Sequence, residues 1–169
     1  MKTYQITFKN QLRALYPIIL IEVLFISLLI YLYEPTNGFY FYLQCTGILF
    51  FILFCFVIFL HLQYYNRNKY TIVKIDEEQN EIKISPRGGD FVLILPAEIK
   101  KIEFHLSYGT YYNWSYRNLP FDDYHYCKIF LNNNKSYILT SLLAENLDFM
   151  FKNINVSKER NLRFYNNIK

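Results

Sequence analysis

The chain has 169 residues, of which 53% are hydrophobic and 19% are charged, and its formal net charge is +4. This length leaves room for one small domain and a membrane anchor. The basic residues form no clustered stripe, which argues against a DNA- or RNA-binding domain. The three cysteines have neither the spacing of a metal site nor that of a disulfide framework. We therefore expect no metal, no cofactor and no nucleic-acid partner.

Two long apolar runs occupy residues 14–33 and 39–62. Each is long enough to cross a hydrocarbon core of about 30 Å as a helix. The connection at 34–38 is short and contains Pro, Asn and Gly, which favour a turn. The sequence therefore predicts an antiparallel hairpin of two transmembrane helices, with an anchor at 1–65 and a second domain at 66–169.

The charges beside the apolar runs predict an orientation. Lys2, Lys9 and Arg13 precede the first run. Arg67 and Lys69 follow the second run, whereas the connection between the runs has no Lys or Arg. Because cytoplasmic flanks carry the excess of Lys and Arg, both termini are expected in the cytoplasm, with the lipid bilayer as a partner.

Glu22 lies near the middle of the first apolar run, where a charge costs at least a few kcal/mol. One interpretation is a protonated side chain that hydrogen-bonds the partner helix near Gln44, Cys45 or Thr46. In the other interpretation, Glu22 lines an oligomeric interface or a pore and takes part in the assembly of the hairpins in the membrane.

Short alternating apolar runs follow the anchor and predict β-strands separated by turn-forming residues. The segment 142–154 instead repeats apolar residues at spacings of three and four, which predicts one C-terminal amphipathic helix. A mainly antiparallel β domain with one such helix is therefore expected. The strands are expected at residues 70–75, 81–85, 91–95, 98–106, 124–131 and 136–140.

Six or seven antiparallel strands before one helix resemble a pleckstrin-homology-like (PH-like) domain. The segment 95–104, LPAEIKKIEF, resembles a strand entry of bacterial membrane-anchored domains of that type. The layout is also similar to bacterial antiviral (CBASS-type) membrane effectors, which have two transmembrane helices and a cytoplasmic β-barrel. That resemblance implies an inner-membrane homo-oligomer whose barrel binds a cyclic oligonucleotide while its helices assemble to disrupt the membrane. Whether the β domain is a closed barrel or PH-like stays open.

The segment 108–126 combines the only Trp of the chain with many Tyr residues and a few polar side chains. Aromatic faces can stack on bases, and a guanidinium can pair with a phosphate or lie over a base. The alternative is a strand edge whose tyrosines pack or contact lipid headgroups. The candidate ligand-binding residues, with a cyclic nucleotide as the possible ligand, are Tyr111, Tyr112, Trp114, Tyr116, Arg117 and His125.

Catalytic residues are not expected in this chain. Asp122 and Asp123 are adjacent, so on a strand they would point to opposite faces. His125 and Cys127 lack a third group that would orient them as a nucleophile pair. The expected function is that of a non-enzymatic antiviral membrane effector, in which a ligand controls assembly of the hairpins. The alternative is a membrane-tethered PH-like scaffold that recruits a protein or a lipid headgroup.

Overall fold

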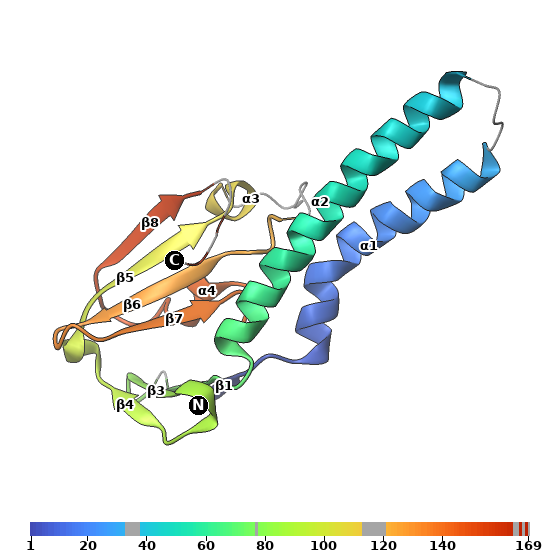
Figure 1. Cartoon of the computed structure of the whole chain (residues 1–169). Helices are drawn as coiled ribbons and strands as arrows, with labels where there is room; N and C mark the ends of the chain where they lie inside the picture. Colours follow the sequence, from blue (N-terminus) through green and yellow to red (C-terminus); the bar gives the residue numbers. More distant parts are fainter. Residues whose placement is uncertain (33–37, 77, 113–120, 164–165, 167, 169) are drawn as a thin grey trace.

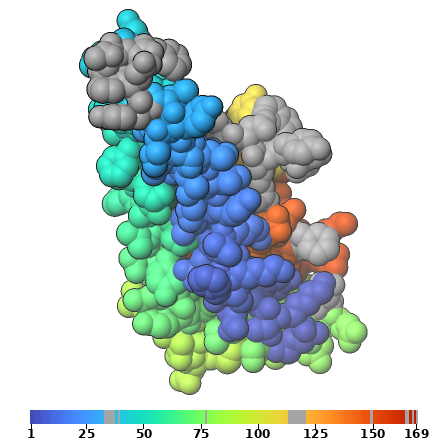
Figure 2. All heavy atoms as spheres, turned by 90° about the vertical axis from the view of Figure 1, so that its right-hand side faces the viewer, coloured from blue at the N-terminus to red at the C-terminus, as the bar shows by residue number. Residues whose placement is uncertain are grey.

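The computed structural model describes residues 1–32, 38–76, 78–112, 121–163, 166 and 168. Two long helices rise side by side from a β domain made of two sheets (Figure 1). In the space-filling view the helices form a column that extends well beyond the β domain (Figure 2). The molecule therefore has an elongated helical part and a compact β part.

The helical part consists of α1 (Phe8–Tyr31) and α2 (Gly38–Asn68). Helix α1 begins at Thr7, whose side chain accepts a hydrogen bond of 3.2 Å from the backbone of Asn10. At 1.5 Å per residue the two helices are about 36 and 46 Å long. Their apolar windows have mean hydropathies of 2.3 and 2.6, so both helices are long and apolar enough to cross a membrane. The expected pair of long apolar helices is thus confirmed.

Close packing between α1 and α2 depends on Gly47. A Cβ atom at this position would lie 2.7 Å from Cε1 of Phe25 and 3.5 Å from Cδ1 of Leu29. The Phe25 ring also contacts Phe50, with 5.2 Å between the ring centroids. A small residue here lets the two helices approach closely, as at many helix contacts in lipid.

Among the described residues the β part contains two four-stranded sheets, which do not close into a barrel. In sheet A every strand pair is antiparallel. In sheet B the pairs are also antiparallel, except that β8 runs parallel to β5. Sheet A has the order β1-β2-β3-β4, from β1 (Lys2–Tyr4), β2 (Ile72–Asp76), β3 (Glu81–Ser85) and β4 (Val92–Ile94). Sheet B has the order β7-β6-β5-β8, from β5 (Ile99–Leu106), β6 (Tyr126–Leu131), β7 (Ser136–Thr140) and β8 (Lys158–Leu162).

The first strand of sheet A precedes the helices in the sequence. Lys2 pairs with Ile75, and Tyr4 pairs with Val73. The helical hairpin is therefore inserted between the first two strands of this sheet. The division into 1–65 and 66–169 stays a prediction, but sheet A takes strands from both sides of it.

Between the sheets lies an apolar core that includes Ile82 and Ile84 of β3 and Phe104 of β5. Connections around the core include the turns η1 (Pro86–Gly88) and η2 (Pro96–Glu98) and the short helix α3 (Tyr108–Tyr111). The six strands expected from alternation all appear, whereas β1 and β8 were not expected. A two-sheet arrangement of this kind fits a PH-like fold rather than a barrel.

The amphipathic helix expected at 142–154 is not present; the structure has a single helical turn, α4 (Leu147–Met150). The apolar residues that suggested it are nevertheless buried at 4% exposure or less. Turns with hydrogen bonds between residues three apart, such as Ile154 N to Phe151 O at 3.1 Å, form much of the rest of this segment. Apolar spacing shows which side chains are buried, but so short a segment has no helical stability of its own. The buried residues are Leu143, Leu147, Met150, Phe151 and Ile154.

Candidate functional site

The ends of α1 and α2 nearest the β domain pack against sheet B and the chain beside it, and we call this contact the junction. Every residue of its apolar cluster is exposed by 7% or less. Because both sides are apolar and excluded from water, the helices are held firmly against the domain. The cluster contains Ala14 and Ile18 of α1, Val57, Leu60 and Tyr64 of α2, and Tyr124, Tyr126, Ile138 and Leu142 of the β part.

Asn68, the last residue of α2, joins the helix to the outer edge of β7. Its side-chain nitrogen donates to the carbonyl of Ile138 at 3.0 Å and to Oγ1 of Thr71 at 3.2 Å. Its side-chain oxygen accepts from the amide of Thr140 at 2.9 Å. Strand β7 is at the edge of sheet B, so Asn68 pairs with backbone groups that no neighbouring strand bonds.

Further polar contacts lie along the same stretch of α2. The side chain of Gln63 donates to the carbonyl of Ile168 at 3.1 Å and accepts from its amide at 3.3 Å. The hydroxyl of Tyr64 donates to the carbonyl of Asn166 at 2.8 Å. Nδ1 of His61 lies 3.1 Å from the hydroxyl of Tyr124, and burial raises the pKa of that phenol. The junction therefore has both an apolar and a hydrogen-bonded part.

Helix α1 is fixed by its first turns. The side chain of Asn10 donates to the carbonyl of Leu142 at 3.0 Å. Arg13 forms an ion pair with Glu145 at 3.2 Å and donates to the carbonyl of Ser141 at 3.4 Å. Helix α1 is thus tied to the connection that follows β7, whereas Asn68 ties α2 to β7 itself.

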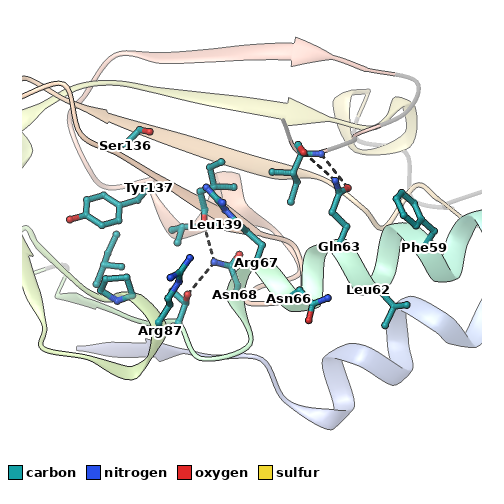
Figure 3. Close-up of a pocket in the computed structure, with 15 residues that line it drawn as sticks. Phe59, Leu62, Gln63, Asn66, Arg67, Asn68, Arg87, Ser136, Tyr137 and Leu139 are labelled. Atoms are coloured by element: carbon teal, nitrogen blue, oxygen red, sulfur yellow. Dashed lines mark hydrogen bonds between the residues drawn. The ribbon is translucent and has the colours of Figure 1, made fainter.

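A cavity of about 840 Å³ opens beside the end of α2 (Figure 3). This volume lies in the range of small-molecule sites, roughly 300–1,000 Å³. Its walls come from four parts of the fold: α2 with the residues after it, sheet A with its η1 turn, β7, and Ile168 near the C-terminus. The lining residues are Phe59, Leu62, Gln63, Asn66, Arg67, Asn68, Thr71, Ile84, Pro86, Arg87, Ser136, Tyr137, Ile138, Leu139 and Ile168.

Two arginines line this cavity from different elements, Arg67 from α2 and Arg87 from η1. Both are exposed, and neither forms an ion pair within the part of the chain that the structure describes. Arg87 also has a φ of 58°, a left-handed conformation that costs a residue with a Cβ atom about 1 kcal/mol or more. Their two positive charges, each on a fork of N–H donors, are suited to an anion such as phosphate.

The remaining lining residues add an aromatic ring and several amides. Tyr137 lies on the same side of the cavity as the two arginines in Figure 3. Gln63 and Asn66 line it from α2. A flat ring beside guanidinium and amide groups can hold a phosphate-bearing molecule with a planar base.

The aromatic segment that the sequence singled out is only partly described. Trp114, Tyr116 and Arg117 lie outside the described residues. Tyr111 is half-buried, packs against the core and lies under the guanidinium of Arg160, 5.5 Å from its ring centroid. The two remaining candidates are Tyr112, which is 51% exposed, and His125, which is 1% exposed.

His125 and Asp122 contribute to the structure around this segment. The amide of His125 lies 3.4 Å from the hydroxyl of Ser141, and its carbonyl accepts from the amide of Ser141 at 2.9 Å. The carbonyl of Asp122 accepts a hydrogen bond of 2.6 Å from the Ser107 hydroxyl, beside α3. A ligand at Tyr112 would therefore reach His125 only if this part of the domain opened. The ligand-binding role of these residues stays a prediction.

Glu22 is half-buried and lies about one helical turn before Phe25, which contacts α2. Its Oε1 is shielded from solvent and has no hydrogen-bond partner among the described residues. Gln44, Cys45 and Thr46, the expected partners, are exposed on α2. The hydroxyl of Thr46 instead donates to the carbonyl of Tyr42 at 2.9 Å. Among the described residues the structure shows no hydrogen bond from Glu22 to α2, and both interpretations of Glu22 stay proposals.

Sequence reasoning missed the cavity because its residues carry no local signal. Arg67 suggested only membrane orientation, and no pattern in the sequence connected Arg87 with a ligand. The two arginines are 20 residues apart in the sequence and line the same cavity because α2 ends beside sheet A. Within the described residues, no group of three or more His, Cys, Asp or Glu could hold a metal ion.

Comparison with known proteins gives one match. A family model described as PH domain matches residues 3–152, from β1 to just beyond α4. The match thus includes the helical hairpin, in agreement with its insertion between β1 and β2. No curated protein and no solved structure matches the chain.

Proposed function

Because this chain belongs to the PH domain family, we propose that it is a membrane-anchored binding protein, not an enzyme, whose PH-like domain senses a small phosphate-bearing ligand in the cavity beside α2. The observation that carries the proposal is the pair of arginines, Arg67 and Arg87, that line one cavity without an ion pair among the described residues. A bound phosphate would supply the missing counter-charge.

Coupling between ligand and membrane helix supports a sensing role. Phe59, Leu62, Gln63 and Asn66 belong both to α2 and to the cavity wall. A ligand would therefore contact the helix itself, and the junction would transmit a shift of α2 to the domain. A ligand changes the equilibrium between two positions of α2 only if it binds the protein more tightly in one position than in the other. Direct contact with α2 provides such a difference.

Control of hairpin assembly, as in an antiviral effector, is the finer part of this proposal. It rests on the layout of the chain and on the contact between cavity and α2. A cyclic nucleotide remains the proposed ligand class, and we propose that it binds in the cavity lined by Tyr137, Arg67 and Arg87. The site in the segment 108–126 stays a prediction. A homo-oligomer in a bacterial inner membrane belongs to the same proposal.

We propose further that both termini are cytoplasmic, because Lys and Arg flank the hairpin on that side only. The test uses an impermeant thiol reagent on intact cells, with Cys45, Cys55 and Cys127 replaced by Ala. Gly38→Cys should be labelled from outside, and Asn132→Cys should be labelled only after lysis. The opposite pattern would reverse the orientation and remove the cavity from the cytoplasm.

Ligand binding is tested on the full chain in nanodiscs of neutral phosphatidylcholine, by calorimetry with pyrophosphate and with a cyclic dinucleotide. Loss of one charged hydrogen-bond donor costs about 1.5–3 kcal/mol, so Arg67→Gln and Arg87→Gln should each weaken binding about 10- to 150-fold. Lys100→Gln is the matched control, because Lys100 is exposed on β5 and does not line the cavity. It should leave the affinity unchanged.

Nanodiscs that contain phosphatidylglycerol separate a soluble ligand from a lipid headgroup. If the anionic lipid competes with the probes and both arginines are needed, the headgroup is the ligand and the protein is a membrane-tethered scaffold. If neither probe nor lipid depends on Arg67 or Arg87, the cavity is not the binding site.

A further inference from the structure

One end of the β domain carries exposed aromatic, apolar and basic side chains together. These are Tyr108 and Tyr112 at α3, with Leu162 and Arg163 at the end of β8, and we call this set the tyrosine end. Tyr108, Tyr112 and Leu162 are 41%, 51% and 42% exposed. The two tyrosine rings pack together, with 4.7 Å between their centroids. The amide of Arg163 donates to the carbonyl of Leu106 at 2.9 Å, so the end of β8 lies beside the end of β5.

The tyrosine end faces along the helices. Helix α3 lies at the end of the domain opposite β4, on the side toward which the free parts of α1 and α2 extend (Figure 1). In the space-filling view α3, in yellow, lies toward the upper end of the molecule, and the yellow-green segment that includes β4 lies at the lower end (Figure 2). Contacts agree with this placement. The amide of Gly109 in α3 lies 3.5 Å from Oδ1 of Asp122. Tyr124, two residues after Asp122, packs against Tyr64 of α2 at the junction.

The length of α2 gives the expected position of the membrane boundary along this helix. From Gly38 to Val57, the first α2 residue of the junction cluster, the helix rises about 29 Å. The hydrocarbon core of a bilayer is about 30 Å thick. If the free part of α2 spans that core, its boundary lies near Val57, and the end of the domain that carries α3 faces the headgroups.

The side chains of the tyrosine end suit that position. Tyrosine is enriched at membrane interfaces, because its ring is apolar and its hydroxyl stays hydrated. Arg163 is exposed and has no ion pair among the described residues, so it can pair with an anionic headgroup. The nearby carboxylates Asp122 and Asp123 are only 2% and 8% exposed.

We infer that the tyrosine end is a second membrane contact, which lies on the surface of the bilayer that α1 and α2 span. This inference rests on the membrane anchoring in the proposed function. It gives the domain a fixed tilt, with α3 at the headgroups and β4 away from them. The cavity beside Arg67 then opens farther from the lipid than α3 does, where a soluble ligand can reach it.

The experiment places a nitroxide label on the full chain in vesicles of phosphatidylcholine and phosphatidylglycerol, with the native cysteines replaced by Ala. Labels at Tyr108→Cys and Leu162→Cys report the tyrosine end. A label at Tyr70→Cys is the matched control, because Tyr70 is 59% exposed beside Gly88 of η1, away from α3. A label at Leu49→Cys, 66% exposed on α2, reports the anchor.

Power saturation compares collisions of each label with oxygen, which enriches in lipid, and with a water-soluble nickel complex. We expect oxygen to dominate at 49, 108 and 162, and nickel to dominate at 70. If 108 and 162 behave like 70 while 49 is in lipid, the inference is wrong and the anchoring stands. If 49 is also in water, the anchoring itself is wrong.

Arg163→Gln should lower the oxygen preference at 108 only in vesicles that contain phosphatidylglycerol. An equal change in neutral vesicles would contradict a headgroup contact.

Discussion

Replacement of Asn68 by Ala should loosen β7 from the end of α2. The substitution removes the hydrogen bonds to Ile138 and Thr71 and the one from Thr140. Asn68 and Thr140 are 3% and 0% exposed, so the freed amide of Thr140 and carbonyl of Ile138 are shielded from solvent. The change therefore removes three hydrogen bonds and leaves two backbone groups, the amide of Thr140 and the carbonyl of Ile138, without their partner.

The magnitude follows from those two groups. An unpaired buried donor or acceptor costs about 1–3 kcal/mol. Asn68 and Ile138 line the cavity, so water can replace part of the lost bonding. We therefore expect a loss of about 2–4 kcal/mol in the local opening free energy, which corresponds to exchange of the Thr140 amide about 30- to 700-fold faster.

Hydrogen exchange of the full chain in nanodiscs measures this effect. Asn132→Ala is the matched control, because Asn132 is exposed and its side chain makes a hydrogen bond of 2.9 Å to the carbonyl of Ala97. It should cost less than about 1 kcal/mol, since water replaces an exposed hydrogen bond readily. Asn68→Asp keeps the acceptor for Thr140 and should slow exchange there relative to Asn68→Ala. Equal exchange of Thr140 in Asn68→Ala and in the parent chain would refute the reasoning.

Two further substitutions test the packing of the hairpin and the titration of the domain. Gly47→Leu should lower the stability of the hairpin in thermal unfolding by about 1–3 kcal/mol, because the new side chain meets Phe25. Gly38→Leu is the control and should have little effect, because nothing lies within 4 Å of a Cβ atom at Gly38. Burial, and then the charge of Arg163, lowers the pKa of His105 from its ordinary value of 6.5. The unfolded chain therefore binds a proton that the folded chain resists, and stability should fall as the pH drops below about 6.5. His105→Gln should flatten that pH dependence of unfolding, and an unchanged slope would show that another group causes it.

Much of the architecture followed from local patterns. The two apolar runs predicted the long helices, because a run of about 20 apolar residues suits a membrane helix. Alternation predicted β2 to β7, because side chains on a strand point to opposite faces in turn. The spacing of Leu147 and Phe151 correctly indicated burial, although it suggested a longer helix than α4. These features depend on neighbours in the sequence, which is why the sequence alone contains them.

The junction and its cavity depend on contacts between distant parts of the chain. Strand β1 is three residues long and has no alternation to reveal it, so only its pairing with β2 identifies it. Arg67 and Arg87 line one cavity because α2 ends beside sheet A, and no local pattern connects them. The sequence suggested that His125 could contact a ligand, but in the structure its side chain is buried and its amide lies against the hydroxyl of Ser141. The sequence by itself determined the two long helices and strands β2 to β7, because those depend on local spacing. Only the tertiary structure decided which side chains meet, because that depends on how the hairpin is inserted into the sheet.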